Sequence, residues 1–338
     1  MAGFSAKTIG LFLITLSVCA SVFSQTPASD SGMTTFHAGT QLVLVDVIPE
    51  YTPDSHSRSL LTELKREDFR VFDNRKEMSI AGFDIGVANQ TRPIALWLIV
   101  QCPLGFQPGW ASDFIRGKTQ YLSPALAHLA RNDVVGVAHW CDNGIANIDL
   151  SPVHDPAAAL ATVDQVMSQK PAHGANRSGE LAMQQMIRMV VSDVQAATPD
   201  RLPVLIFLYG DHSGTSLSEA DKIIESVLES SGVVFGISDN GWRFKPDSMF
   251  GGGNVDYLVH YYSQETGGGF YGADDPKLYS AALDYVLSQL HLRYTLSFKP
   301  LALDGKRHQL KVELTKNAQG KFRGAQLRHR QSYIPIRR

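Results

Sequence analysis

Cysteines and histidines lie close to the ends of strongly apolar segments. Cys102 follows residues 94–100 (IALWLIV), and Cys141 follows residues 134–140 (VVGVAHW). Continuously apolar segments of this length are typical of strands buried on both faces of a parallel sheet. Ligands of such sheets bind beyond the carboxyl ends of the strands, so a binding edge is expected there. Its expected residues are Gln101, Cys102, His139, Cys141, Asp142, Asp211, His212 and Asp239.

One chemistry open to this edge is a disulfide between Cys102 and Cys141. Residues 94–100 and 134–140 are expected to be neighbouring strands, which lie about 4.8 Å apart. A disulfide requires Cα atoms about 4.4–6.8 Å apart, and both cysteines would stand just past the ends of these strands. The bond would add roughly 3–4 kcal/mol of stability. The alternative is two separate buried thiols acting as small apolar groups.

A second chemistry is a transition-metal site. Imidazole and carboxylate ligands suit Zn²⁺. No two of the candidates have the i, i+4 spacing of ligands on one helix, so loops would have to bring them together. We therefore favour solvent-edge or hydrogen-bonded loop roles for these side chains. The candidates are His139, Asp142, His173, Asp211 and His212.

A third chemistry is hydrolysis. Residues 210–214 (GDHSG) follow an apolar segment and precede a helical one, which is the setting of a nucleophile elbow. The elbow pattern G-x-S-x-G places the nucleophile at its centre, whereas His212 is central here. Ser213 more simply begins a polar turn. We therefore predict no catalytic residue.

The elements that would position these residues alternate between strands and helices over residues 91–291. This alternation predicts a doubly wound α/β sheet. The segment 145–150 follows its predecessor closely, so it is expected to run antiparallel. The other strands are expected at 94–100, 134–140, 204–209, 233–237 and 269–271, and the helices at 112–131, 156–168, 178–197, 217–230, 255–266 and 276–291.

Two β-rich segments flank this domain, at residues 39–90 and 292–338. Neither is large enough to bury a core alone, so we expect them to pack together. Pro49 is expected to end the first strand, and Asp73 and Asn74 are expected to form a turn. The expected strands are 40–48, 69–72, 78–85, 294–298, 308–314 and 326–333.

The N-terminus has the features of a secretory signal peptide over residues 1–24. Lys7 supplies a positive charge, and residues 9–18 are mostly apolar but shorter than the ~20 residues of a membrane-spanning helix. Small residues then precede Gln25, so residues 25–38 would be a linker in a periplasmic, envelope-bound or secreted protein. Lipid attachment at Cys19 is the alternative, and the bulky Val18 before it argues against that. Residues after 24 contain no apolar run long enough to span a membrane.

The C-terminal segment is basic. Residues 291–338 contain 12 Lys and Arg against 2 Asp and Glu, whereas the whole chain has a net charge of −2. Such a segment can bind nucleic acid or an anionic surface. Export argues against nucleic acid, and we favour solvated strand faces beside an acidic domain.

Several stretches resemble one family. Residues 42–47 (LVLVDV), 60–83 (LLTELKREDFRVFDNRKEMSIAGF), 261–300 (YYSQETGGGFYGADDPKLYSAALDYVLSQLHLRYTLSFKP) and 331–335 (QSYIP) look like exported bacterial, acidobacterial-type, von Willebrand factor type A-related (VWFA-related) proteins. The resemblance covers nearly all of the chain after residue 24. It implies a type A (VWA) α/β fold flanked by β segments, with a role in binding or adhesion.

The family's metal-ion-dependent adhesion site looks degenerate here. That site uses Asp-x-Ser-x-Ser after the first strand and an Asp after the fourth, because Mg²⁺ prefers oxygen ligands. Gln101 replaces the first Asp, and Pro103 and Gly105 replace the serines. Gly210 falls on the second Asp position, and Asp211 could serve only after a one-residue shift. The resemblance therefore implies no metal at the usual site.

These observations favour an exported, non-catalytic module for adhesion or envelope assembly. Its expected partner is a protein or a cell-surface polymer, with no nucleic acid and no cofactor. The alternative is a metal-dependent receptor, holding Mg²⁺ or Zn²⁺, or a hydrolase that uses the altered His/Asp edge.

Export makes a prediction about the mature N-terminus. Signal peptidase should remove residues 1–24, so the protein recovered from outside the cytoplasm should begin at Gln25. Mass spectrometry of the N-terminal peptide tests this. A chain that still begins at Met1, or one that begins at a lipid-modified Cys19, would contradict it.

Overall fold

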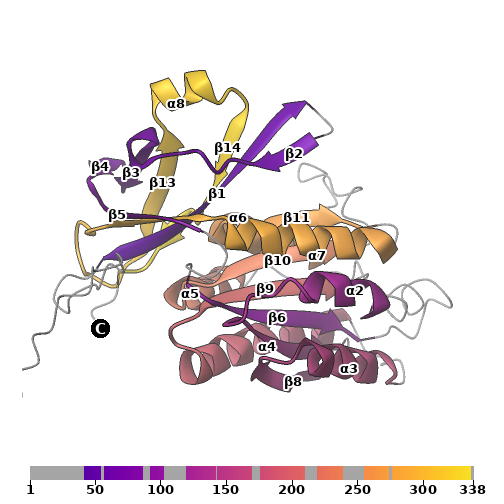
Figure 1. Ribbon diagram of the computed structural model, residues 1–338. Helices are drawn as coiled ribbons and strands as arrows, with labels where there is room; N and C mark the ends of the chain where they lie inside the picture. The colour runs from indigo at the N-terminus through magenta and orange to yellow at the C-terminus, as the bar shows by residue number, and fades with distance from the viewer. Residues whose placement is uncertain are drawn as a thin grey trace, which may run out of the picture. The chain divides into compact units, whose positions relative to one another are not determined.

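The computed structural model describes most of the chain after residue 41 (Figure 1). Residues 40–338 form one compact unit. No helix among the described residues has the length and apolarity needed to cross a membrane. The described residues are 42–54, 57–86, 92–102, 119–141, 143–169, 176–209, 219–238, 255–273 and 276–335.

A central sheet of six strands forms the α/β domain. Five of the strands are parallel, and β8 runs antiparallel to β7 at one edge, as predicted. In spatial order the strands are β11 (Gly269–Gly272), β10 (Val233–Ser238), β9 (Leu202–Tyr209), β6 (Ile94–Gln101), β7 (Val134–Trp140) and β8 (Ala146–Val153).

Helices cover both faces of this sheet. Along β6, Leu96 and Leu98 face one apolar core, whereas Trp97 and Ile99 face the other. This alternation on a strand buried along its whole length confirms the doubly wound α/β fold. The first core includes α2 (Thr119–Leu126), α3 (Pro156–Met167) and α7 (Pro276–His291), and the second includes α4 (Asn176–Ala197), α5 (Ala220–Glu229) and α6 (Val255–Thr266).

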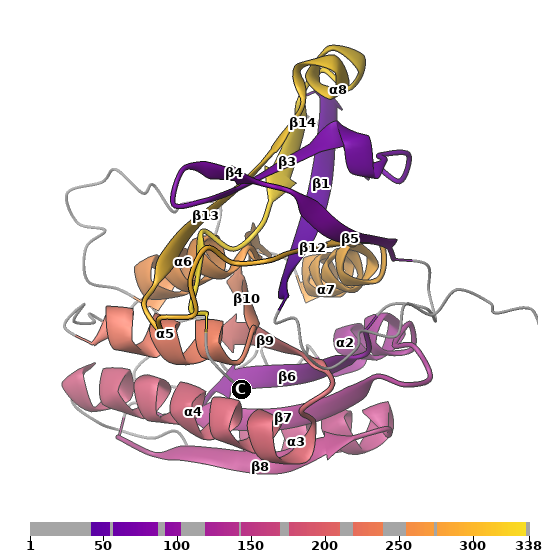
Figure 2. The ribbon, with the colours of Figure 1, turned by 90° about the vertical axis from the view of Figure 1, so that its left-hand side faces the viewer.

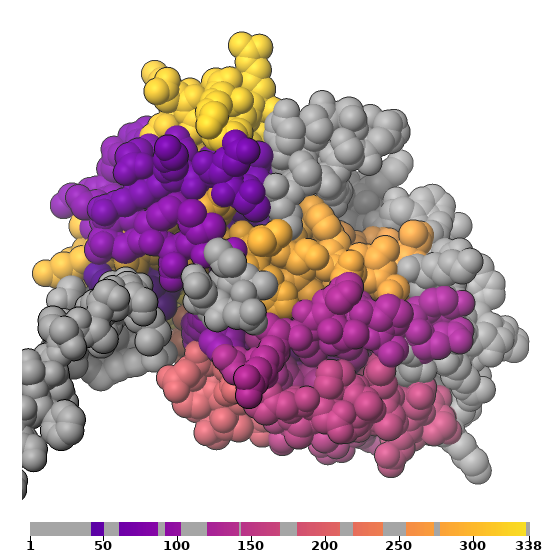
Figure 3. Space-filling view, viewed as in Figure 1, coloured from indigo at the N-terminus to yellow at the C-terminus, as the bar shows by residue number. Residues whose placement is uncertain are grey.

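The segments before and after the α/β domain form a β module of two antiparallel sheets, so the prediction that they pack together is confirmed. Figure 2 shows the N-terminal indigo strands beside the C-terminal yellow ones, and in Figure 3 the atoms of these two parts of the chain adjoin at the surface. One sheet has β1 (Val43–Asp54), β2 (Ser57–Leu60), β5 (Ile80–Ile85), β12 (Tyr294–Phe298) and β14 (Ala325–Arg328); the other has β3 (Phe69–Asp73), β4 (Lys76–Met78), β13 (His308–Leu314) and β15 (Ser332–Tyr333).

The module has its own apolar core between the two sheets. Val45 and Val47 of β1 meet Val71 of β3 there, together with Leu310 and Val312 of β13. Buried and more exposed residues alternate along the whole of β13, and the residues that follow Leu310 and Val312, Lys311 and Glu313, are the more exposed ones. Strands from both ends of the chain thus complete one core that neither end could bury alone.

Strand β1 does not stop at Pro49, so that prediction is wrong. The strand pairs with β12 as far as Val47 and then exchanges this partner for β14 from Ile48 onward. Proline lacks only the N–H donor, and the carbonyl of Pro49 still accepts a hydrogen bond from the Leu61 amide at 3.4 Å. The new partners therefore let the strand continue to Asp54.

The predicted returning strand 78–85 is two strands. Asn74 and Arg75 have φ angles of 47° and 70°, which turn the chain tightly from β3 into β4. The chain then crosses to the other sheet, where β5 pairs with β12. The predicted strand 326–333 is likewise divided between β14 and β15, and the helix predicted over 112–131 ends at Leu126 in its described part. The short helix α8 (Lys316–Lys321) is not predicted by the sequence.

A buried arginine joins the β module to the α/β domain. The Arg293 side chain is fully buried, and its Nε donates to Asp46 Oδ1 at 3.0 Å. Its Nη2 donates to the carbonyl of Arg92 at 2.8 Å, just before β6. Burial tends to raise the pKa of Asp46, but attraction to Arg293 and the hydrogen bond from Thr295 outweigh it, so the pKa falls below its usual value. The carboxylate of Asp46 therefore stays ionised at neutral pH.

A second joint lies around Glu50 of β1. Its Oε1 accepts from Gln289 Nε2 at 2.9 Å and from the Tyr285 hydroxyl at 3.2 Å, both on α7. Arg328 of β14 contacts the same oxygen at 2.9 Å and donates to the carbonyl of Gly268 at 2.8 Å. One carboxylate therefore connects two strands of the module with a helix of the α/β domain.

Glycines allow the chain to approach β10 closely before β11. A Cβ atom at Gly268 would lie 1.8 Å from the carbonyl oxygen of Val234. Gly267 has a φ of +80°, and a Cβ there would lie 2.4 Å from the backbone of His329. The glycine cluster thus serves a close approach between backbones.

Substitution of Gly268 should therefore destabilise the fold. In Gly268→Ala the new methyl group meets the backbone of a buried strand, which cannot move away easily, so we expect a loss of about 3 kcal/mol. Gly320→Ala is the matched control, because nothing lies within 4 Å of a Cβ there and alanine favours the helix. Urea unfolding of both variants measures the difference. Equal midpoints would contradict the close approach.

Candidate functional site

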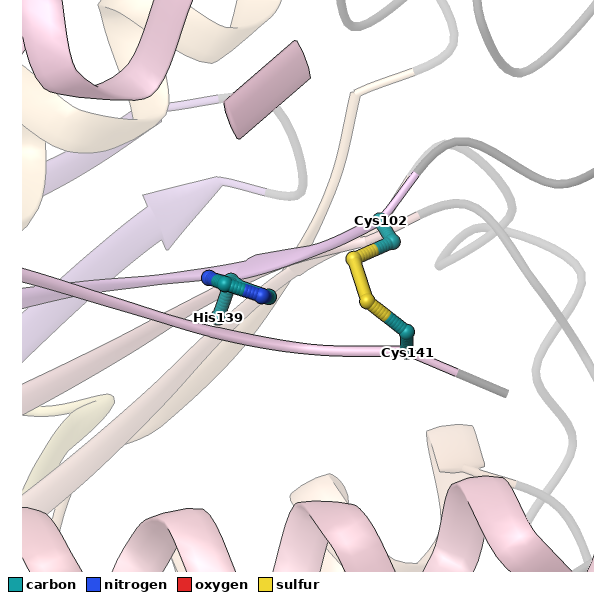
Figure 4. A group of neighbouring side chains, drawn as sticks. All are labelled: Cys102, His139 and Cys141. Atoms are coloured by element: carbon teal, nitrogen blue, oxygen red, sulfur yellow. A yellow bond between two sulfur atoms is a disulfide. The ribbon is translucent and has the colours of Figure 1, made fainter. Parts of the chain in front are cut away.

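The carboxyl ends of β6 and β7 hold a disulfide. In the parallel register Gln101 lies opposite Trp140, so the next residues, Cys102 and Cys141, stand side by side. Their Cα atoms are 4.9 Å apart, and the structure joins their sulfurs (Figure 4). The two cysteines are 4% and 3% exposed, so the bond is buried. The structure therefore contains the disulfide that strand adjacency predicts.

His139 lies beside this disulfide (Figure 4). Side chains alternate along a strand, so His139 and Cys141 share one face of β7. Cys102 continues the face of β6 that carries Leu98 and Val100. Donor atoms of the two cysteines and of His139 all lie within 4.8 Å of one another. Three residues with metal-binding chemistry thus meet on the face covered by α2, α3 and α7.

Backbone hydrogen bonds hold both cysteines. The amide of Cys102 donates to the carbonyl of Trp140 at 2.9 Å, which extends the ladder beyond β6. The amide of Cys141 donates to the carbonyl of Ile145 at 2.8 Å, and the amide of Gly144 donates back to the carbonyl of Cys141 at 3.0 Å. Gly144 has a φ of 93°, which only glycine adopts readily. A tight turn therefore follows Cys141 into β8.

A carboxylate orients the His139 ring. Asp149 of β8 lies with its Oδ2 2.7 Å from Nδ1 of His139. The other oxygen of Asp149, Oδ1, accepts from the side-chain Nδ2 of Asn147 at 3.0 Å. The side chains of His139 and Asp149 are 5% and 12% exposed. Asp149 therefore orients the His139 ring, and Asn147 orients Asp149, all within the paired strands β7 and β8.

A separate polar pair, Tyr209 and Asp256, lies at the carboxyl end of β9. The hydroxyl of Tyr209, the last residue of β9, donates to Asp256 Oδ1 in the first turn of α6 at 2.8 Å. Both residues are buried. Burial and the negative charge of Asp256 raise the pKa of Tyr209 well above its usual value, so the phenol stays neutral. The carboxylate is therefore occupied by an internal hydrogen bond.

Tyr279 of α7 satisfies the ends of the neighbouring strands. Its hydroxyl lies 3.3 Å from the carbonyl oxygen of Tyr209 and 3.4 Å from that of Ile237. Carbonyl groups at the ends of β9 and β10 thus have a partner from within the protein. The residues Tyr209, Asp256 and Tyr279 are not predicted as a group by the sequence. A tyrosine ending an apolar strand and an aspartate opening a helix are its only signals.

The structure brings together part of the predicted edge. Cys102, His139 and Cys141 meet, and Gln101, the position of the first adhesion-site Asp, ends β6 and is 1% exposed. The remaining predicted positions lie outside the described residues: Pro103, Gly105, Asp142, His173, Gly210, Asp211, His212, Ser213 and Asp239.

The described part of the edge has limited reactivity while the disulfide is intact. Cysteine is a strong metal ligand or nucleophile only as a thiolate, and sulfur in a disulfide is neither. Among the described residues, the group able to hold a metal ion comprises Cys102, His139 and Cys141. In the oxidised protein this group offers one imidazole, which is already oriented by Asp149.

The chain is similar in structure to several solved proteins. The sequence matches no protein-family model and no curated protein. An aerotolerance-related membrane protein of Bacteroides fragilis is 13% identical, with a TM-score of 0.40 over 58% of this chain and 99% of its own. BatB of Bacteroides thetaiotaomicron is 14% identical, with a TM-score of 0.40 over 58% and 98%. A von Willebrand factor type A protein of Catenulispora acidiphila is 11% identical, with a TM-score of 0.42 over 78% and 75%.

The disulfide makes a prediction about stability. Its cysteines are separated by 39 residues, and closing a loop of this length should add roughly 3–4 kcal/mol to the free energy of unfolding. A phosphine reductant, with EDTA present, should therefore lower the midpoint of urea unfolding. The double variant Cys102→Ala/Cys141→Ala is the control, and its midpoint should not respond. A midpoint that stays unchanged in the wild type would contradict a stabilising bond.

Proposed function

We propose that this von Willebrand factor type A-like protein is an exported, non-catalytic binding module with a degenerate metal-ion-dependent adhesion site. Its role is adhesion or envelope assembly, and its partner is a protein or a cell-surface polymer. The observation that carries the proposal is the end of β6. Gln101 is buried and neutral there, and the next residue, Cys102, is fixed in a disulfide.

The charge at this position argues against a bound Mg²⁺. A buried divalent cation must be compensated by anionic oxygen ligands, because its loss of hydration is costly. Gln101 supplies no negative charge. The disulfide also holds Cys102, the residue after Gln101, against β7.

The described polar side chains of the edge support a non-catalytic role. A general base must be within hydrogen-bonding reach of a substrate proton. His139 is buried and held by Asp149, and Tyr209 is buried and held by Asp256. Each of these pairs is engaged in a structural hydrogen bond.

The disulfide and the N-terminal segment support export. Disulfides persist in oxidising compartments and are rare in the cytosol. The bond between Cys102 and Cys141 therefore agrees with the signal peptide predicted over residues 1–24. Together they favour the periplasm, the cell envelope or the exterior as the place of action.

Retention of a partner in EDTA tests this proposal. The oxidised chain is immobilised and incubated with envelope extract, with either Mg²⁺ or EDTA present. We expect the same bound components in both arms, because the site lacks its anionic ligands. A type A domain with an intact Asp-x-Ser-x-Ser motif is the control, since EDTA should remove its Mg²⁺-dependent ligand.

One outcome of the EDTA experiment would contradict the proposal. Loss of the bound components in EDTA, and their return with Mg²⁺, would favour a metal-dependent receptor over the proposed module.

A further inference from the structure

The cysteines and the histidine at the end of β6 and β7 have the composition of a zinc site. Two cysteine thiolates and one imidazole are ligands that Zn²⁺ accepts. Donor atoms of Cys102, His139 and Cys141 already lie within 4.8 Å of one another. We infer that these three residues bind Zn²⁺ in the reduced protein, and that the disulfide is the metal-free state of the same site.

The spacing of the cysteines suits both states. Zinc–sulfur bonds of about 2.3 Å place two sulfurs about 3.8 Å apart in a tetrahedron. The Cα atoms of Cys102 and Cys141 are 4.9 Å apart, and both side chains come from paired strands on one face of the sheet. Small rotations of the two side chains could therefore open the sulfurs around a cation without moving β6 or β7.

The orientation of His139 provides an independent argument. Asp149 occupies the Nδ1 side of the ring, which leaves Nε2 as the metal donor. A carboxylate behind a metal-binding histidine fixes the ring and raises its basicity. Asn147 holds the second oxygen of that carboxylate. The imidazole is therefore oriented in advance, on strands rather than on a mobile loop.

Burial favours a cation once the disulfide is broken. Cys102, His139 and Cys141 are 4%, 4% and 3% exposed. Zn²⁺ would neutralise two buried thiolates, and burial of uncompensated charge is costly. Three protein donors leave the fourth coordination position for water or for a donor of a binding partner.

The conversion between the two states is a balanced thiol–disulfide exchange. A dithiol reductant attacks the bond between Cys102 and Cys141, and two electrons and two protons pass to the cysteines while the dithiol becomes a disulfide. Zn²⁺ then displaces the two thiol protons as it binds. In the reverse direction a disulfide oxidant takes two electrons from the two thiolates and two protons from solvent, becomes a dithiol, and leaves Cys102 and Cys141 joined with the Zn²⁺ released. The two states therefore exclude each other.

Zinc binding by the reduced chain tests the inference. The whole chain is made without an affinity tag in a reducing cell-free extract, so that the thiols stay reduced. It is equilibrated with Zn²⁺, freed of excess metal and analysed by mass spectrometry for zinc and for alkylated thiols. We expect about one zinc per reduced chain and little zinc after oxidation. Co²⁺ in place of Zn²⁺ should give a thiolate charge-transfer absorption.

Substitutions identify the ligands. Cys102→Ser and Cys141→Ser should each abolish the cobalt–thiolate spectrum of a two-thiolate site. Asp149→Asn should weaken zinc binding about 10–100-fold while both thiols remain, because it removes the carboxylate behind His139. His128→Asn is the matched control, since His128 forms an exposed pair with Asp284 away from this edge.

Three results would overturn the inference. They are a reduced chain in which Cys102 and Cys141 can both be alkylated but no zinc is bound, zinc binding that persists in the double variant Cys102→Ser/Cys141→Ser, and equal zinc binding before and after oxidation. The partner-binding experiment uses the oxidised chain, so its failure and the failure of this inference are distinguishable.

Discussion

Strands β6 and β7 pair in parallel from Ala95 opposite Val134 to Gln101 opposite Trp140. This register determines the chemistry of the carboxyl edge. The residue after each strand end is a cysteine, so the register places two sulfurs next to each other. The period of two then directs His139 to the same side, whereas Gln101 and Trp140 point to the opposite face. A shift of one residue would place Cys102 on the opposite face of the sheet from Cys141, and therefore also from His139, which shares the face of Cys141.

The β module depends on the α/β domain for its position. Its two sheets share an apolar core, and the buried side chain of Arg293 connects the module to the central sheet with its partner Asp46, which is 20% exposed. Arg293 lies between the end of α7 and the start of β12, and its side chain donates to Asp46 and to the carbonyl of Arg92 before β6. Removing one partner of a buried pair costs about 3–5 kcal/mol, because the remaining charge is left uncompensated. Such a pair favours one arrangement of the module over others.

Much of this architecture is predictable from sequence pattern. The bounds of β7, β12, β13, α6 and α7 agree with the predicted ranges, because burial on both faces, strict alternation or a long helical period defines each of them. The prediction that β1 stops at Pro49 is wrong, because the exchange of β12 for β14 depends on residues about 250 to 280 positions away in the chain. The sequence pattern around Pro49 therefore does not indicate that β1 pairs with β14.

The candidate site is predictable to a similar degree. Strand adjacency alone brings Cys102 to Cys141. The contact between His139 and Asp149 is not predictable in this way, because the register of β7 and β8 shifts between Val137 and Ala138. The bond from Tyr209 to Asp256 also requires the position of α6 over the end of β9, which depends on packing in the second apolar core.

The central claim is that a disulfide occupies the edge where a cation-binding site would begin. The most direct measurement is the intact mass of the exported protein after alkylation, without and with prior reduction. Our account predicts no alkylation of Cys102 and Cys141 without reductant, and two alkyl groups after reduction. Two alkyl groups on the folded, unreduced protein would contradict it.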